Sequence, residues 1–309
     1  KTLLLEPELI TTDSSELFLQ ALAQQCAVNE YIYPISKQED LSIQHLNRVV
    51  EDSLERKSSI EDRVILTLAC YKNLYAIRYK ERIEKSVLTN DIVEFQISQV
   101  ARQKKISKDI PSLSVIRDQV SNRVRQQYEE NSYPRWINTV TFTESRTVSQ
   151  LLKDLGLKNA EEIRIDRPKI LIAGCGTGRH AVLTSSRFTG SRVTAFDLSI
   201  NSVGYAKLKS QEFGINGIRY MHGDLLNIGE LGEKFDIVES VGVLHHMDKP
   251  IEGLIALKEV LKTGGLMRLA LYSESARAGV IQARKLIETK YSKGSIEDRI
   301  RSFRQGIIN

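Results

Sequence analysis

Glycine is missing from the first 155 residues of this chain, and all 18 glycines lie at Gly156 or later. Backbone positions with positive φ favour glycine, so turns that depend on it are expected in the second half. The first half also lacks strand-like alternation, and its apolar residues recur at three- and four-residue steps. These features predict an all-α N-terminal domain of about five helices.

Cysteine and long apolar runs are scarce too. The three cysteines, Cys26, Cys70 and Cys175, lack metal-ligand spacing, and their odd number argues against a disulfide framework. No apolar run approaches the roughly 20 residues of a transmembrane helix. We therefore expect a cytoplasmic protein without a membrane partner or a metal site. The chain begins at Lys1 without methionine, which suggests a fragment.

The excess of positive charge is small: 44 basic and 39 acidic residues give a net charge of +5. Basic residues cluster at 102–105, 117–125 and 299–304. Such clusters can bind nucleic acid or an acidic substrate, but they also form the solvated faces of amphipathic helices. Aromatic residues are not interleaved with these charges, so the bases of a single strand have no stacking platform.

The helical half contains recognisable helix starts. Asp13 to Glu16 starts a helix that is expected to reach Cys26. A capping box is predicted at 58–61, followed by a helical stripe of Val64, Leu68, Tyr71 and Tyr75. Pro111 is expected to start another helix that reaches Tyr128. We predict a helical domain at 1–140 and a connector at 141–165 with a short helix near 148–155. An α/β domain then occupies 166–309.

Five strand-like segments follow in the second half, separated by helix-like segments. The strands are expected at 169–173, 192–197, 218–222, 235–240 and 266–272. The first strand ends in Gly174, Gly176 and Gly178, and a helix is expected over 179–188. Glycines at such a turn let a ligand approach the bare backbone. Asp197 ends the second strand about 20 residues later, where a crossover returns it beside the glycines to bind a ribose diol.

This order of elements, from Pro168 to Ser273, resembles a class I S-adenosylmethionine-dependent methyltransferase with a Rossmann-like sheet. A nicotinamide-binding Rossmann enzyme fits less well, because Arg179 stands where that fingerprint wants a small residue. The resemblance implies S-adenosyl-L-methionine as cofactor and S-adenosyl-L-homocysteine as product. It implies these cofactor-binding residues: Gly174, Cys175, Gly176, Gly178, Asp197, Leu198, Asp224, Leu225 and Val241. Asp224 is expected to bind the adenine amino group, Leu198 and Leu225 its ring faces, and the Val241 carbonyl the ammonium.

Two departures from the class are visible. Such loops commonly carry an acidic residue two before the first glycine, and this chain has Ile172. The ammonium contact must therefore come from elsewhere, such as Tyr128, Glu129 or the backbone. No antiparallel strand pair closes the sheet before Asn309, so we expect five strands, with the closing strands in a continuation of the chain.

The segment from Tyr128 to Trp136 concentrates two tyrosines, two carboxylates, an arginine and the only tryptophan at a helix end. It predicts either a lid over the cleft, formed by Tyr128, Tyr133, Arg135 and Trp136, or an aromatic hinge between domains. With its Tyr-Pro-Arg-Trp run, the chain resembles bacterial methyltransferases associated with tetratricopeptide repeats. The Ala-x-Gln-Cys run at 23–26 carries the likeness too, whereas Ser132 replaces a usual proline and the repeats are absent.

A general base that removes the proton of the acceptor is expected at the rim of the predicted site. His245 follows the fourth strand and is the first candidate; Glu129 and Glu130 are its rivals, and His246 is placed with the substrate side. The Asn/Asp-Pro-Pro-aromatic motif of DNA amino-methyltransferases is absent, which makes a DNA acceptor unlikely. The acceptor is predicted to be a nitrogen or oxygen of a peptide, protein or small molecule. A catalytically silent binding module stays the alternative, and the oligomeric state stays open.

Overall fold

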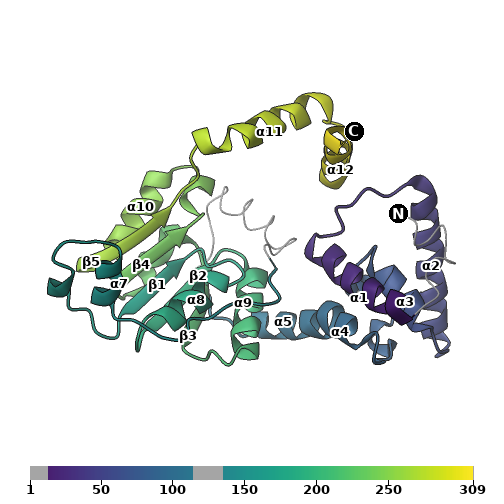
Figure 1. The fold of residues 1–309 in the computed structure, drawn as a ribbon, viewed down its shortest axis with the longest axis horizontal. Helices are drawn as coiled ribbons and strands as arrows, with labels where there is room; N and C mark the ends of the chain where they lie inside the picture. Colours follow the sequence, from purple (N-terminus) through teal and green to yellow (C-terminus); the bar gives the residue numbers. More distant parts are fainter. Residues whose placement is uncertain (1–12, 114–134, 309) are drawn as a thin grey trace. The chain divides into compact units, whose positions relative to one another are not determined.

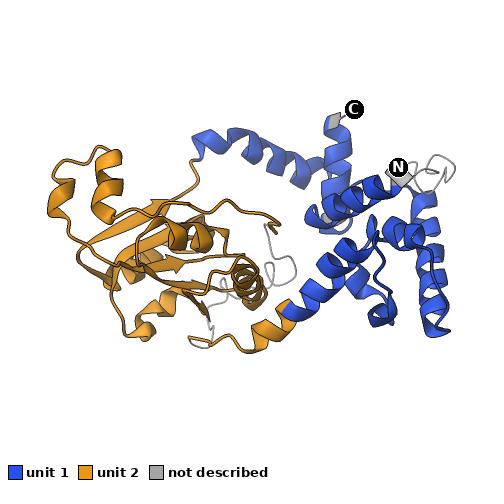
Figure 2. Cartoon of the chain, turned by 60° about the horizontal axis from the view of Figure 1, so that its bottom comes forward, with its two compact units in different colours: residues 1–102, 274–309 blue, residues 103–273 orange. Residues whose placement is uncertain are grey.

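The computed structural model describes residues 13–113 and 135–308. They divide into two compact units, which are coloured separately in Figure 2. The unit that we call the helical unit combines the chain up to Arg102 with the segment from Glu274 onward. The sheet unit runs from Gln103 to Ser273. Each unit is described by itself below.

The helical unit is a bundle of short helices around an apolar core. Its first part contains α1 (Asp13–Val28), α2 (Lys37–Glu55) and α3 (Asp62–Ala69), shown in Figure 1. Leu19, Val50, Leu66 and Leu74 are fully buried in the core. The predicted helix from Asp13 through Cys26 is confirmed. Periodic apolar residues in this half are therefore core residues.

The capping box predicted at 58–61 is wrong. Helix α3 begins at Asp62 after Glu61, without a side-chain cap, and ends at Ala69, so that Tyr71 and Tyr75 lie beyond it. The backbone N–H of Ser58 instead bonds the Ser53 carbonyl and helps to end α2. A capping box does occur at the start of α2, where Ser36 and Glu39 bond each other's backbone N–H.

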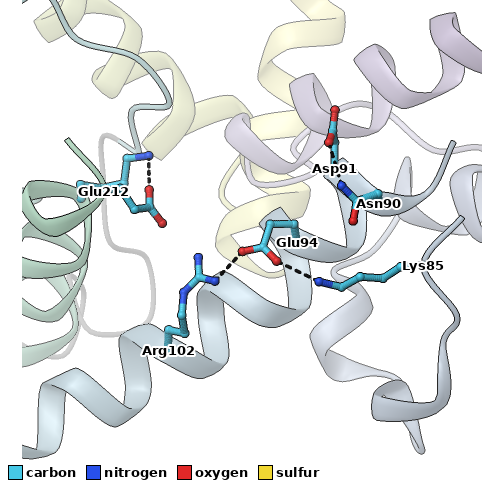
Figure 3. Close-up of polar contacts among 7 residues, drawn as sticks. Lys85, Asn90, Asp91, Glu94, Arg102 and Glu212 are labelled. Atoms are coloured by element: carbon cyan, nitrogen blue, oxygen red, sulfur yellow. Dashed lines mark hydrogen bonds and ion pairs between the residues drawn. The ribbon is translucent and has the colours of Figure 1, made fainter. Parts of the chain in front are cut away.

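The next helix changes its winding along its length. It starts as α4 (Asn90–Val93), widens into a π turn at Glu94–Ser98 and continues as α5 (Gln99–Lys108). Glu94 lies between two cations, with Lys85 Nζ at 3.0 Å and an Arg102 guanidinium nitrogen at 2.6 Å (Figure 3). The π turn directs Gln96 into the core, where its amide accepts from Leu74 N–H and donates to the Ala69 carbonyl. The boundary between the units falls within α5.

The last two helices, α11 (Ala278–Lys290) and α12 (Ile296–Ile308), group with the helical unit. Arg301 donates to the Tyr31 carbonyl and the Arg304 guanidinium lies 5.6 Å from the Tyr33 ring centre. These contacts attach α12 to the turn after α1. The sequence placed this segment in the α/β domain and residues 103–113 in the helical domain, so the units divide the chain at other positions.

The sheet unit is built on five parallel strands in the order β3-β2-β1-β4-β5 (Figure 1). Their bounds are β1 Lys169–Ala173, β2 Arg192–Asp197, β3 Ile218–His222, β4 Phe235–Val241 and β5 Leu261–Ala270. The predicted Rossmann-like α/β fold with an N-terminal helical region is confirmed. Along β1, Ile170 and Ile172 face one core, whereas Leu171 and Ala173 face the other.

Helices cover both faces of this sheet. The first core holds residues of α7 (Val148–Asp154), α8 (Arg179–Arg187) and α9 (Ile200–Glu212). The second holds residues of α10 (Pro250–Glu259) and of the 3-10 segment Leu225–Leu231. Strands buried on both faces explain the continuous apolar runs of the sequence.

The fifth strand was predicted to start at Leu266, but β5 begins at Leu261 and includes the glycine pair Gly264 and Gly265. The pairing with β4 shifts register between Phe235 and Ile237, and Gly264 takes a φ of 75°. The glycines therefore mark an irregularity inside the strand. Among the described residues, the sheet has no antiparallel strand. No helix in the described ranges is long and apolar enough to cross a membrane.

Candidate functional site

The loops after the five strands meet at one edge of the sheet, because the carboxyl ends of parallel strands point the same way. The strand order reverses between β1 and β4, and ligands of open α/β sheets bind in the crevice at such a switch point. The loop after β1 and the loop after β4 are in contact there. A Cβ built on Gly174 would lie 2.2 Å from Val243 Cγ2, so only glycine lets these loops approach so closely.

The glycine loop has one closely packed side and one open side. Gly174, Gly176 and Gly178 all have positive φ, at 75°, 52° and 86°. A Cβ on Gly178 would lie 2.4 Å from Ala206 Cβ, because α9 packs against this turn. A Cβ on Gly176, by contrast, would meet no atom of the described residues within 4 Å. The bare backbone at Gly176 is thus the part of the loop that a ligand can approach.

Asp197 lies beside this open part of the loop. Its Oδ2 accepts from Gly176 N–H at 2.8 Å, and its Oδ1 accepts from Ser199 N–H at 2.9 Å. Burial raises the pKa of Asp197, and the two N–H bonds and the nearby His222 oppose that rise. Each carboxylate oxygen can accept more than one hydrogen bond, so both can still receive a hydroxyl. Asp197 can therefore hold two neighbouring hydroxyls, such as those of a ribose.

The loop after β3 contributes a second carboxylate. Asp224 is 3% exposed, and its Oδ1 accepts from Leu226 N–H, which leaves Oδ2 for an exocyclic amine. Leu225 is buried in the core with α10, whereas Leu198 is half-buried at the edge. The two leucines thus offer different amounts of surface to an adenine ring.

His222 joins the loops after β2 and β3. It pairs in register with Asp197, and its Nε2 lies 2.9 Å from the Leu198 carbonyl. A carbonyl only accepts, so Nε2 carries the proton and Nδ1 faces the Ser112 hydroxyl at 3.3 Å. Its backbone also bonds Pro111 and Leu113. Only the register of β3 with β2 reveals this role.

The loop after β4 brings aromatic rings together. The His245 ring centre lies 4.3 Å from that of His246 and 3.9 Å from that of Tyr272, which follows β5. Val241 is 37% exposed at the end of β4, and Gly242 N–H bonds the Ala270 carbonyl. The sequence missed Tyr272 as a site residue, because no spacing connects it to His245.

Trp136 fastens the chain to the glycine loop. Its indole N–H donates to the Thr177 carbonyl at 2.9 Å, and its own carbonyl accepts from the Tyr205 hydroxyl at 2.7 Å. The side chain is only 5% exposed, and Arg135 lies over the Tyr205 ring. All of these contacts lie within the sheet unit, so the choice between a lid and a hinge stays a prediction. The other predicted residues of this segment lie outside the described residues: Tyr128, Glu129, Glu130 and Tyr133.

These groups fit S-adenosylmethionine. The open backbone at Gly176 admits the ligand next to Asp197 for the ribose, while Asp224 has an oxygen for the adenine amine. Val241, 37% exposed at the end of β4, brings its backbone to the same edge of the sheet. The donor and acceptor set therefore suits a nucleoside that carries an amino-acid chain.

Comparison with known proteins agrees with a site for S-adenosylmethionine. Residues 170–265 match the family described as Methyltransferase domain. An uncharacterized protein of Synechococcus sp. is 34% identical over 125 residues, which are 40% of this chain and 30% of that protein. The ubiquinone biosynthesis O-methyltransferase of Roseobacter denitrificans is 29% identical over 113 residues, 37% and 44% of the two chains. The mitochondrial protein of that name from Schizosaccharomyces pombe is 34% identical over 116 residues, 37% and 41%.

This chain thus spans less than half the length of each of these three relatives. Among solved structures, PKMT2 from Rickettsia typhi in complex with AdoHcy has a TM-score of 0.45 at 19% identity, covering 56% of this chain and 34% of that one. A TM-score this low adds nothing to the argument. Since residues 170–265 match the family and contain most of a five-stranded Rossmann-like sheet, the chain carries a class I, S-adenosylmethionine-dependent methyltransferase domain.

Proposed function

We propose that this protein transfers the methyl group of S-adenosylmethionine to the hydroxyl of a small molecule. The observation that carries the proposal is the switch point, where the open backbone at Gly176 and the Asp197 carboxylate lie on one side of the crevice and the loop with His245 on the other. The sulfonium of the cofactor supplies an already activated methyl group. The protein therefore has to position the acceptor, remove its proton and exclude water.

Each residue has a defined task in this proposal. Asp197 holds the ribose, Asp224 the adenine amine, and the Val241 carbonyl the ammonium. His245 accepts the proton of the acceptor hydroxyl while the oxygen forms its bond to the methyl carbon and the carbon–sulfur bond breaks. Histidine suits this step because its ordinary pKa lies near neutrality. S-adenosylhomocysteine and the methyl ether are the products.

The acceptor class rests on the relatives. The proteins from Roseobacter denitrificans and Schizosaccharomyces pombe are O-methyltransferases of ubiquinone biosynthesis by name, which favours an oxygen of a small molecule. The aromatic surface of Tyr272, 55% exposed beside His245, suits a planar acceptor. A peptide or protein acceptor is the alternative. The two differ in whether the methyl label appears in the small molecules or in the proteins of a cell extract.

The test has two stages. Calorimetric titration with S-adenosylmethionine, S-adenosylhomocysteine and reduced nicotinamide dinucleotide should show binding of the first two alone. Labelled methyl groups should then appear in the small-molecule fraction of an extract. Retention of nicotinamide, or binding of no ligand, would overturn the proposal; label in protein would move the acceptor to a peptide.

The base is tested by His245→Gln. We expect kcat to fall by at least about 100-fold, as for loss of a general base, with unchanged affinity for S-adenosylhomocysteine. His246→Gln is the matched control, because His246 is the exposed neighbour in the same turn. Equal, small losses in both variants would exclude His245 as the base.

A further inference from the structure

Glu239 is a buried carboxylate to which the proposed mechanism gives no task. It belongs to β4 and is only 2% exposed. In the parallel pairing of β1 with β4, Glu239 is the register partner of Ile172, which stands two residues before Gly174. Register partners point to the same face of a sheet. The carboxylate therefore lies just below the glycine loop, on the neighbouring strand.

The partners of Glu239 come from the helix that follows this loop and from β5. His180 Nε2 lies 2.7 Å from Oε2, and the Thr184 hydroxyl donates to the same oxygen at 2.8 Å. Among the described residues, Oε1 faces a nitrogen of Arg268, at 3.5 Å. Burial alone would raise the pKa of Glu239, but these partners hold it below its ordinary value. The group is thus a carboxylate at neutral pH.

The two oxygens are used unequally. Oε2 lies close to two groups of α8, of which the Thr184 hydroxyl donates to it, whereas among the described residues Oε1 has one distant cation whose side chain is 50% exposed. A buried negative charge is costly unless cations and donors compensate it. Oε1 therefore has an energetic preference for one more cationic donor.

The glycine loop itself offers no acid. Residues 172–178 contain no aspartate or glutamate, and Asp197 already bonds Gly176 and Ser199 on the β2 side of the loop. S-adenosylmethionine carries an ammonium at its amino-acid end. On the β4 side of the loop, where the Val241 carbonyl was assigned to that end, Glu239 is two residues earlier on the same strand and same face.

We propose that the Glu239 carboxylate neutralises the ammonium of the cofactor's amino-acid end, through Oε1, while His180 and Thr184 fix its Oε2. This inference rests on the proposed cofactor binding and adds the residue that recognises the amino-acid end. A purely structural role, in which Glu239 only attaches the first turn of α8 to β4, is the competing explanation.

Two ligands separate these explanations: S-adenosylhomocysteine, which has the amino-acid end, and methylthioadenosine, which lacks it. In Glu239→Gln, calorimetry should show affinity for S-adenosylhomocysteine reduced by roughly 10- to 100-fold, the effect of one charge-assisted hydrogen bond. Affinity for methylthioadenosine should stay within about twofold, which also shows that the variant is folded. Glu233→Gln, which removes a surface carboxylate paired with Arg219, should change neither.

A second variant moves the charge between strands. In Ile172→Glu/Glu239→Leu, the carboxylate returns on the register partner, and the preference for S-adenosylhomocysteine over methylthioadenosine should recover at least partly. This variant decides the matter if Glu239→Gln does not fold. Parallel loss of both ligands in folded variants, or no loss, would overturn the inference and leave the proposed function standing. Wild-type protein that binds neither ligand would overturn both.

Discussion

Glu39 in the helical unit and Glu239 in the sheet unit are both 2% exposed, yet they are held in different ways. Glu39 bonds Ser36, three residues away, in the capping box that starts α2, and its other oxygen accepts a longer bond from the Tyr71 hydroxyl at 3.4 Å. Glu239 is held by His180 and Thr184, from successive turns of α8, and by Arg268 of β5. The two bonds of the capping box are local and close a helix end, whereas the partners of Glu239 meet it only because the fold brings distant residues together.

The same difference extends to other buried polar groups. In the helical unit, the Gln96 amide bonds only backbone groups of Leu74 and Ala69. In the sheet unit, Asp197 and Asp224 bond the backbone with part of each carboxylate and keep accepting capacity toward the crevice. Polar groups that the backbone saturates maintain a fold, and those that keep capacity at one edge can bind a ligand. Cofactor chemistry is therefore expected to depend on the sheet unit.

The largest effect is expected from Asp197→Ala. Two hydrogen bonds from hydroxyls to a charged group are worth about 3–6 kcal/mol together, so affinity for S-adenosylhomocysteine should fall at least about 100-fold. The midpoint of thermal unfolding should fall modestly, because Gly176 N–H and Ser199 N–H lose their acceptor while β2 keeps its pairing. Asp166→Ala, an exposed aspartate before β1, serves as the matched control. Wild-type affinity in Asp197→Ala would refute the ribose assignment.

A core substitution in the helical unit should lower stability without changing cofactor affinity. Leu66→Ala in α3 removes a fully buried side chain and should cost about 2–5 kcal/mol of stability in that unit. Trp136, the only tryptophan, lies in the sheet unit, so its fluorescence reports that unit, while circular dichroism reports mostly helices. We expect the dichroism transition to shift and cofactor affinity to stay unchanged. Leu41→Ala, at a position 66% exposed, should shift neither signal.

If fluorescence and dichroism moved together in Leu66→Ala, the two units would unfold as one cooperative body. The helical unit and the sheet unit would then differ in how their buried polar groups are bonded, but not in when they unfold.

A smaller effect is expected on how the stability of the helical unit depends on pH, through Glu39. Burial alone would raise the pKa of Glu39, but its bonds to Ser36 hold it below the ordinary value of 4.5. A folded-state pKa that is lowered gives stability that is present above the ordinary value and lost as pH falls through the folded value. Glu39→Gln and Ser36→Ala should therefore each cost about 1 kcal/mol at neutral pH, as for loss of a cap. For Glu39→Gln the difference from wild type should disappear in acid below pH 4.5.

Urea unfolding at several pH values measures this. Glu81→Gln changes an exposed glutamate of the same unit and should follow the wild type throughout. A difference for Glu39→Gln that grows in acid would show that Glu39 is destabilising as a carboxylate.

Local signals in the sequence were sufficient for much of the fold. Strands β1, β2 and β3 occur as predicted, since buried parallel strands are continuous apolar runs that end in glycine or aspartate. The start of β5 was missed because Gly264 and Gly265 usually indicate a loop, and only pairing with β4 keeps them in the strand. The box at 58–61 failed because the Ser58 backbone ends α2 instead.

The candidate site also contains residues that the sequence alone can identify and residues that only the fold brings together. Asp197 and the glycines could be selected because the βα turn and crossover that place them are local and regular. The approach of His245 to Tyr272, and of His180 to Glu239, depends on which strands are neighbours and in which register. Spacing along one sequence does not contain that information.

The smallest effect is expected from Trp136→Phe. This variant tests whether Trp136 only holds the glycine loop in place or takes part in binding a ligand. Phenylalanine keeps most of the packing on Tyr205 but cannot donate to the Thr177 carbonyl, at a cost of about 0.5–1.5 kcal/mol. Because that carbonyl belongs to the glycine loop, affinity for S-adenosylhomocysteine should fall about 2- to 10-fold while the KM for the acceptor stays unchanged. Phe213→Leu, which touches the indole but not the loop, should lower stability alone. A lower kcat with unchanged cofactor affinity in Trp136→Phe would instead make Trp136 part of a lid, and the contrast between anchoring and binding groups would fail at this residue.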